Sequence, residues 1–202
     1  MGRRARQEIL FDGCFAHILS RSFDKLWLFE EGKDFQTFEK LLLEAKEKFG
    51  FLIHHYCLMH THFHLLVSIP DVGRFSTGLQ WLKRQHTLAF NAPRKRSGPL
   101  WRERFKSQLI ENESYLYACG RYIEENPVKA NLVPRPEDWP HSSAAHYRLV
   151  RKNPLIEPYE FDPDKNALPK VDQEMMERGT AIGSELFFLH LEEGLLREVS
   201  VP

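Results

Sequence analysis

The chain has 202 residues, of which 42% are hydrophobic and 28% are charged, and its 28 Lys and Arg residues equal its 28 Asp and Glu residues. This composition is typical of globular proteins and excludes the collagen-like and intrinsically disordered classes. No apolar run approaches the roughly 20 residues that a membrane-spanning helix needs, and Asp12, His17 and Arg21 interrupt the apolar stretch near the N-terminus. We therefore expect neither a signal peptide nor a membrane partner.

The balanced total hides two segments of opposite charge. Residues 74–106 contain nine basic residues and one acidic residue, a net charge of +8, whereas residues 157–202 contain eleven acidic and four basic residues, a net charge of −7. A basic segment of this kind favours a polyanionic partner, and the acidic segment either keeps the protein in solution or masks the basic surface. Both segments are also compatible with solvated faces that bind nothing.

The cysteines indicate the compartment. Cys14, Cys57 and Cys119 are odd in number, far apart in the sequence and without a Cys-x-x-Cys pair. This pattern predicts neither a disulfide framework nor a thiolate zinc site. We expect a protein of the reducing cytoplasm.

The first half of the chain has the pattern of a strand, a helix and a hairpin. Residues 15–20 alternate as in a strand, and Asp34 is the expected N-cap of a helix that Gly50 ends. The expected apolar face of this helix, spaced by three and four residues, comprises Phe35, Phe38, Leu41, Leu42, Ala45 and Phe49. Residues 51–59 and 62–69 are apolar runs of strand length separated by a short turn, which predicts a β-hairpin.

A helix, a strand and another helix follow. The first helix is expected over residues 75–90, and its expected buried face comprises Phe75, Leu79, Leu82 and Leu88. A basic loop leads to a strand over residues 105–110. Asn112 is the expected N-cap of a helix over residues 113–125, which Pro127 stops. The order β, α, β, β, α, β, α predicts an α+β fold, a ferredoxin-like split βαβ sheet with an added helix.

The C-terminal quarter differs in composition. After Trp139, prolines punctuate an acidic, weakly periodic stretch that ends near residue 172. Helical spacing returns over residues 174–193 and involves Met175, Ile182, Leu186, Leu189 and Leu195. We therefore predict a main domain over residues 1–150, followed by an acidic linker and a small helical C-terminal appendage over residues 151–202.

The most informative stretch reads His60-Thr61-His62-Phe63-His64. On a strand, His62 and His64 share one face while Phe63 points to the other. Two neutral imidazoles on a rigid strand are a good start for a metal site, which also needs a third ligand and partners that orient the rings. His60 extends the alternation, so an alternative is a zinc site of three histidines with water in the fourth position. An exposed sheet face without a ligand is compatible with the same pattern.

A second candidate group lies in the last predicted helix of the main domain. Tyr122 and Asn126 are four residues apart and so share a helix face, and Pro127 biases Asn126 out of the helical conformation. A tyrosine hydroxyl beside a metal ligand can act as a nucleophile, because a divalent cation activates the hydroxyl and neutralises the group attacked. The alternative is structural, with Tyr115 and Tyr122 as core aromatics and Asn126 as a helix C-cap.

Four motifs in their order and spacing resemble those of a known family. The motifs are residues 59–67, 100–107, 122–130 and 139–143. Together they resemble the REP-associated tyrosine transposases, a branch of the single-tyrosine HUH transposases. The resemblance also includes His17, Arg21 and the helix start at residues 34–38, and covers about residues 14–148. Residues 60 and 61 depart from the family pattern, since His-Thr stands where Pro-Asn is usual.

This resemblance implies a role for each candidate residue. His62 and His64 would be the histidines of the HUH pair, Asn126 the third metal ligand and Tyr122 the nucleophile. The metal would be Mg²⁺ or Mn²⁺, and the substrate single-stranded DNA at the foot of a REP-like hairpin. Attack would leave a 5′-phosphotyrosine and a free 3′-OH. We accordingly expect residues 1–150 to be the catalytic domain of a bacterial, nucleoid-associated DNA transposase, either monomer or homodimer.

Basic and aromatic residues near the motifs suit such a substrate. The candidate phosphate-binding residues are Lys83, Arg84, Arg102, Arg104, Lys106 and Arg121. Trp81 or Trp101 could stack on an unpaired base, and both are equally compatible with the core. Two alternatives stay open: a nucleic-acid-binding module on an RRM-like sheet that does not cleave, and a zinc hydrolase that uses His60, His62 and His64.

Overall fold

The computed structural model describes residues 10–159, 169, 171, 173–177, 181–184 and 187. Its sheet has the strand order β2-β3-β1-β4-β5. The strands are β1 (Cys14–Arg21), β2 (Leu52–Met59), β3 (His62–Ile69), β4 (Lys106–Ile110) and β5 (Ala181–Ile182). The first four pair antiparallel, whereas β5 joins the edge parallel to β4. The order of these four strands is that of a ferredoxin-like sheet, and the α+β prediction is confirmed.

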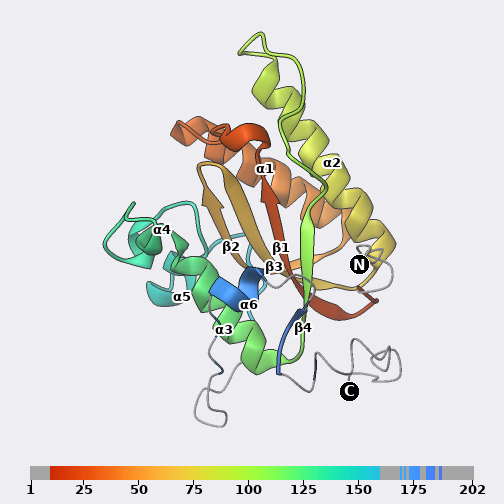
Figure 1. The fold of residues 1–202 in the computed structure, drawn as a ribbon, viewed down its shortest axis with the longest axis vertical. Coiled ribbons are helices and arrows are strands. Elements are labelled where there is room, and N and C mark those ends of the chain that lie inside the picture. Colours follow the sequence, from red (N-terminus) through yellow and green to blue (C-terminus); the bar gives the residue numbers. More distant parts are fainter. Residues whose placement is uncertain are drawn as a thin grey trace.

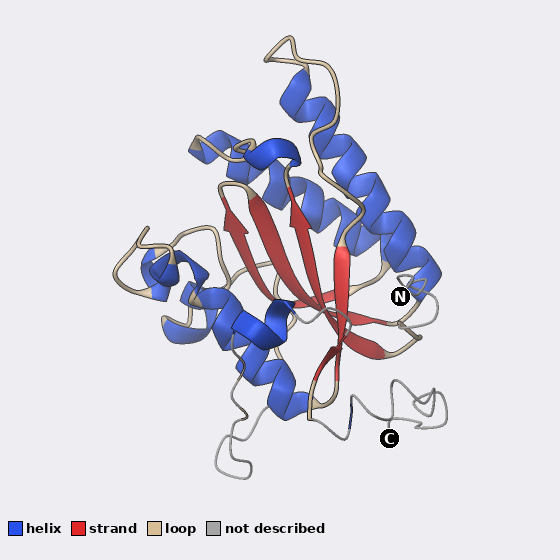
Figure 2. Cartoon of the chain, in the orientation of Figure 1, coloured by secondary structure: helices blue, strands red, loops and turns tan. Residues whose placement is uncertain are grey.

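Helices cover both faces of the sheet (Figures 1 and 2). On one face lie α1 (Gly32–Phe49) and α2 (Val72–Asn91), and on the other lies α3 (Glu113–Glu124). The shorter helices are η2 (Phe23–Lys25), α4 (Asn126–Lys129), η3 (Pro136–Asp138), α5 (Ala144–Arg148) and α6 (Gln173–Glu177). Within the described part of the chain, no helix combines the length and the hydropathy that crossing a membrane requires.

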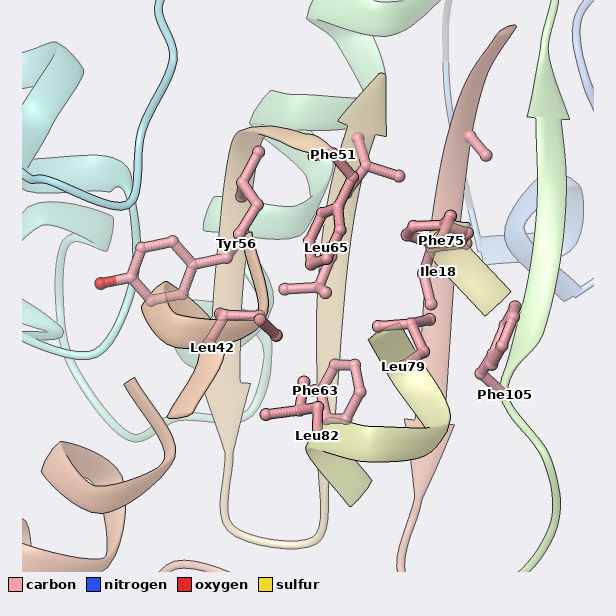
Figure 3. Close-up of a cluster of buried hydrophobic side chains, with 14 of the residues drawn as sticks. Ile18, Leu42, Phe51, Tyr56, Phe63, Leu65, Phe75, Leu79, Leu82 and Phe105 are labelled. Carbon is pink, nitrogen blue, oxygen red and sulfur yellow. The ribbon is translucent and has the colours of Figure 1, made fainter. Parts of the chain in front are cut away.

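The main core lies between the sheet and the pair α1 and α2 (Figure 3). Phe63, Leu65 and Val67 point into it from alternate positions of β3 and are fully buried. Helix α1 does not begin at Asp34 as predicted. Asp34 is instead the third helical residue, and its carboxylate forms a capping box with the true N-cap, Glu31.

Helix α2 corrects one predicted core position. Leu88 is 53% exposed, whereas His86 and Phe90 are buried beside the predicted Leu79 and Leu82. Steps of three and four residues along α2 follow the buried stripe from Leu82 to His86 and Phe90, and they pass over position 88. The polar residue His86 thus belongs to the core, whereas Leu88, which was predicted there, does not.

A second apolar cluster lies between the opposite sheet face and α3. Its buried members include Cys57, Leu66, Leu116, Cys119 and Ile123. Helix α3 begins as predicted, since the Asn112 side chain accepts a hydrogen bond from the Tyr115 amide. Helix α3 ends at Glu124, within one residue of the predicted end. Pro127 does not end helical structure altogether, however. It occupies the first turn of α4, where proline's missing amide hydrogen costs nothing.

The C-terminal segment packs on both edges of the sheet. Leu155 and Ile156 are buried, and Ile156 forms a bridge with Ile53 of β2. Ile182, predicted in a helix, lies in β5 because the edge of β4 offers it backbone hydrogen-bond partners. The other predicted helix positions Leu186, Leu189 and Leu195 lie outside the described residues. The domain boundary at residue 150 stays a prediction.

Candidate active site

One pocket of about 250 Å³ brings together His62, His64, Tyr122 and Asn126. The histidines come from β3, the tyrosine from α3 and the asparagine from α4. The pocket therefore lies on the sheet face that α3 covers, opposite the main core. We refer to it as the His–Tyr pocket.

The two histidines have the geometry of alternate residues on one strand. The ring centroids of His62 and His64 lie 5.1 Å apart, and their planes are inclined by 76°. Burial lowers the pKa of His62 to about 4, assisted by the charge of Arg21. The pKa of His64 is also lowered, first by burial and then by repulsion from the groups around it that carry or can acquire positive charge, namely His17, His62, Arg21 and Lys129. Both rings are thus neutral at physiological pH, which is the form that binds metal ions.

A chain of hydrogen bonds sets the tautomer of His64. Nε2 of Gln108 donates to the Met175 carbonyl at 3.1 Å, so Oε1 of Gln108 is the atom that lies 2.8 Å from Nδ1 of His17. Burial lowers the pKa of His17 to about 4, so this ring is neutral, and its Nδ1 carries the proton that Gln108 accepts. Nε2 of His17 then accepts from Nδ1 of His64 at 2.9 Å. Nε2 of His64 is left unprotonated, with a lone pair for a ligand.

Thr61 orients the other histidine. Its Oγ1 lies 3.1 Å from Nδ1 of His62. When the hydroxyl accepts from this nitrogen, the Nε2 atom of His62 is left with its lone pair, as in His64. Thr61, one of the two residues that depart from the family's usual Pro-Asn, therefore supplies a polar partner for His62.

His60 lies outside this arrangement. Its Nδ1 donates to the Phe29 carbonyl at 2.7 Å, and its ring stacks on that of Trp27 at 4.5 Å between centroids. Among the residues described, no group of three His, Cys, Asp or Glu side chains is placed to hold a metal ion. The three-histidine zinc site considered from the sequence is therefore not formed, because the turn directs His60 toward the aromatic residues before α1.

Tyr122 and Asn126 lie on the same side of the α3–α4 segment, as their spacing predicts. Nδ2 of Asn126 donates to the carbonyls of Tyr122 and Ile123, so the asparagine also caps the helix. These bonds engage Nδ2, so Oδ1 is the atom of Asn126 with lone pairs to offer a cation. The ammonium nitrogen of Lys129 lies 3.6 Å from the centroid of the Tyr122 ring, which places a cation beside the predicted nucleophile.

A buried polar group fixes α3 against β2. Glu124 is 2% exposed, and its Oε1 lies 2.7 Å from Nδ1 of His55 and accepts from the Ser143 hydroxyl at 2.7 Å. The ring of His55 also fills the space beside Gly120, where an added Cβ would lie within 2.4 Å of it. The sequence carried one signal for this group, since Glu124 falls one turn after Gly120 on the buried side of a helix.

The predicted phosphate-binding residues divide between the two faces. Lys106 begins β4 in register with Leu19, two residues before Gln108, and so points toward the His–Tyr side of the sheet. Lys83 and Arg84 belong to α2 on the opposite face. Nζ of Lys83 donates to the Glu103 carbonyl at 2.6 Å. The exposed residues of the set are Arg84, Arg102, Arg104 and Arg121.

Both candidate stacking tryptophans pack against the main core. Trp81 and Trp101 are half-buried there, and Nε1 of Trp101 donates to the Lys83 carbonyl at 3.1 Å. The core interpretation, one of the two alternatives from the sequence, is the one that the structure favours. Helix α6 contributes Gln173 and Met176 to the lining of the His–Tyr pocket.

Comparisons with known proteins agree with this architecture. Residues 12–126 match the IS200-like transposase family. A protein of Haemophilus influenzae described as a REP-associated tyrosine transposase is 31% identical over 118 aligned positions, which cover 54% of this chain and 66% of the relative. The REP-associated tyrosine transposase of Escherichia coli K12 is 26% identical over 110 positions, 54% of this chain and 64% of the relative. The matches thus span just under two thirds of each relative.

A solved structure shares the fold. It is described as a REP-associated tyrosine transposase bound to a REP hairpin, and it matches with a TM-score of 0.61 at 21% identity, over 85% of this chain and 98% of that one. The two curated relatives of this chain are described by the name of the branch that the sequence motifs predict. The chain belongs to the IS200-like transposase family.

Proposed function

We propose that this protein cuts and rejoins single-stranded DNA beside hairpins, through a metal-dependent 5′-phosphotyrosine intermediate on Tyr122. The observation that carries the proposal is the His–Tyr pocket, which gathers two neutral histidines, an amide and a tyrosine from separate elements. The hairpin substrate is supported by the solved relative described as bound to a REP hairpin. Family membership supports the reaction class.

The donor atoms of the pocket fit a divalent cation. His62 and His64 each have Nδ1 engaged by a neighbour, which leaves Nε2, and Asn126 has its amide nitrogen engaged, which leaves Oδ1. Two imidazole nitrogens and an amide oxygen suit Mn²⁺, and with water and phosphate oxygens they also suit Mg²⁺. Such a cation withdraws charge from the scissile phosphate and activates the attacking hydroxyl.

The residues of the chain then perform a transesterification. The Tyr122 hydroxyl loses its proton as its oxygen attacks the phosphorus and the bond from phosphorus to the 3′ oxygen breaks. The departing 3′ oxygen takes up a proton in exchange and becomes a free 3′-OH. One phosphoester replaces another, so the phosphotyrosine keeps the bond energy and rejoining needs no nucleotide cofactor. Lys129, over the Tyr122 ring, contributes positive charge where the phosphate arrives.

The test is formation of a covalent adduct. The protein is incubated with labelled hairpin-bearing single strands and Mn²⁺ or Mg²⁺, and the reaction is resolved under denaturing conditions. We expect a shifted band that EDTA and Tyr122→Phe abolish, while Tyr115→Phe, on the same helix, retains it. Strand binding without any adduct would instead favour the RRM-like binding module.

A further inference from the structure

A second pocket, of about 860 Å³, adjoins the His–Tyr pocket. Arg21 and His62 line both, so the two spaces meet at these side chains. The remaining wall comes from Ser22, from η2, from Thr61 in the turn before β3 and from Arg102. We propose that this space, the flanking pocket, binds one unpaired nucleotide of the strand next to the phosphate at Tyr122. This inference rests on the proposed function and names a subsite for it.

Phe23 gives the flanking pocket a surface for a base. Phe23 is 47% exposed and lines the pocket, whereas every other phenylalanine among the described residues is buried or half-buried. An exposed aromatic ring beside a nucleic-acid site serves as a stacking platform, because every base has an apolar face.

The charges suit a phosphodiester backbone. Arg21, Lys25 and Arg102 line the pocket together with a single acidic residue, Asp24. All three basic residues are exposed, and none of them forms an ion pair with another described residue. A backbone that passes from Tyr122 into the flanking pocket would therefore meet cations that have no ion-pair partner among the described residues.

The Ser22 hydroxyl supplies a third observation. Ser22 is 3% exposed and lines the pocket, yet its oxygen has no hydrogen-bond partner within the described part of the chain. A buried hydroxyl without a partner is unfavourable, so such groups in native structures usually meet a ligand or water. A polar atom of a bound nucleotide would satisfy it.

The backbone that presents Phe23 is strained. Asp24 has φ 49° and ψ 40°, and Lys25 has φ 54°, so two consecutive residues other than glycine adopt the left-handed conformation. Strain of this kind persists where the surrounding structure enforces it, commonly at binding sites. Here backbone bonds from Ser22 N to the Thr61 carbonyl and from Phe23 N to the Leu100 carbonyl hold the chain before the strained pair. A bond from Leu26 N to the Phe23 carbonyl closes the turn after it.

Continuity with Tyr122 selects the occupant. An acidic peptide would also match the charges, but it would not need an aromatic platform one pocket away from a phosphate-attacking tyrosine. A strand that delivers its phosphate to Tyr122 must continue on one side or the other, and the flanking pocket shares two side chains with that site.

The experiment scans the strand for the position that the pocket holds. Binding of the full chain to labelled hairpin-bearing oligonucleotides is measured by fluorescence anisotropy in EDTA, with a single abasic site moved along the unpaired flank. We expect one position where base removal weakens wild-type binding by about 10-fold or more, the range of a base–aromatic stack. Phe23→Ala should weaken binding of the intact strand by a similar factor. Removing the base at that one position should then cause no further loss of affinity in this variant, while base removal at other positions should act as it does in the wild type.

Two further variants control the result. Phe23→Tyr keeps the ring and should restore the wild-type pattern. Trp27→Ala removes another exposed aromatic, 51% exposed and outside the pocket, and should leave the pattern unchanged. The proposal is overturned if Phe23→Ala loses affinity on base removal at the same position as the wild type does. It is also overturned if Trp27→Ala, rather than Phe23→Ala, is the variant that no longer responds to base removal there. Because the assay needs neither metal nor cleavage, the covalent adduct reports separately on the proposed function.

Discussion

Nε2 of His17 lies 2.9 Å from Nδ1 of His64, and this contact joins the central strand of the sheet to the proposed metal site. Its direction depends on Gln108, because the amide oxygen determines which nitrogen of His17 carries the proton. The orientation of a proposed metal ligand, His64, is thus controlled from two strands away. A change at Gln108 should act on metal binding although its side chain does not line the pocket.

We predict that Gln108→Leu weakens Mn²⁺ binding by about 10- to 100-fold, the usual effect of losing a partner behind a ligating histidine. The substitution removes the acceptor for Nδ1 of His17, so His17 can take either tautomer. The proton of His64 is then no longer confined to Nδ1, and Nε2 is no longer always available to the metal. Titration of the protein with Mn²⁺, followed by electron paramagnetic resonance, measures the affinity directly. Gln36→Leu, an exposed glutamine on α1, is the matched control. Equal affinities in the two variants would refute the tautomer argument.

We predict that Gly120→Ala destabilises the protein by about 3 kcal/mol, because the added methyl group would overlap the His55 ring beneath α3. The intrinsic preference of alanine for helices should offset only about 1 kcal/mol of this loss. Urea denaturation gives the difference. Gly32→Ala has open space around its Cβ and should change stability by less than about 1 kcal/mol. Similar stabilities for both variants would contradict the packing at Gly120.

We predict that His86 makes folding sensitive to acid. Burial lowers its pKa to about 4, below the ordinary value of 6.5, so the unfolded chain binds the proton more readily. The stability associated with neutral His86 is present above pH 6.5 and is lost as the pH falls toward 4. By linkage, about 2 kcal/mol should be lost between pH 7.5 and pH 5.

Urea titrations at these two pH values test the His86 prediction. His86→Leu should lose about 2 kcal/mol less than the wild type across the interval. His146→Leu, a half-buried histidine on α5, should behave as the wild type does. An unchanged acid dependence in His86→Leu would show that other groups account for the loss.

We predict that the positive charges near the His–Tyr pocket determine the salt dependence of DNA binding. For single strands, the slope of log affinity against log salt should fall by about 0.7 for each phosphate contact removed. Arg102→Gln and Arg121→Gln should each reduce the slope by this amount, and Lys40→Gln, on the far side of the sheet in α1, should not. Anisotropy titrations at several salt concentrations give the slopes. If Lys40→Gln reduced the slope as much as Arg102→Gln does, the phosphate contacts would not be confined to the side of the His–Tyr pocket.

The sequence predicted the parts of the site that depend on local periodicity. Alternation along a strand places His62 and His64 on one face, and a spacing of four places Tyr122 above Asn126, so both relations could be derived without tertiary structure. It could not predict which residues stand behind the ligands. Gln108 follows His17 by 91 positions, and their contact depends on the register between β1 and β4.

The fold departs from prediction where tertiary contacts override a local pattern. Ile182 matches a helical spacing but lies in β5, because the edge of β4 is available to it. Leu88 is apolar but exposed, because the packing of α2 turns His86 and Phe90 inward. The partner strand β4 is far from Ile182 in the sequence, so local spacing gives no sign of it. The positions of His86 and Phe90, by contrast, follow from helical spacing once Leu82 is placed in the core.

Tyr122 and Asn126 belong to the successive helices α3 and α4, which are joined at Glu125, whereas His62 and His64 belong to a strand of the sheet. A cation shared by the two histidines and the asparagine would therefore cross-link two layers of the fold. Any movement that carries the tyrosine away from the sheet must also pull one ligand from that cation. Under the proposed function, occupancy of the metal site and the position of the nucleophile would thus be thermodynamically linked, and each would stabilise the other by the same free energy.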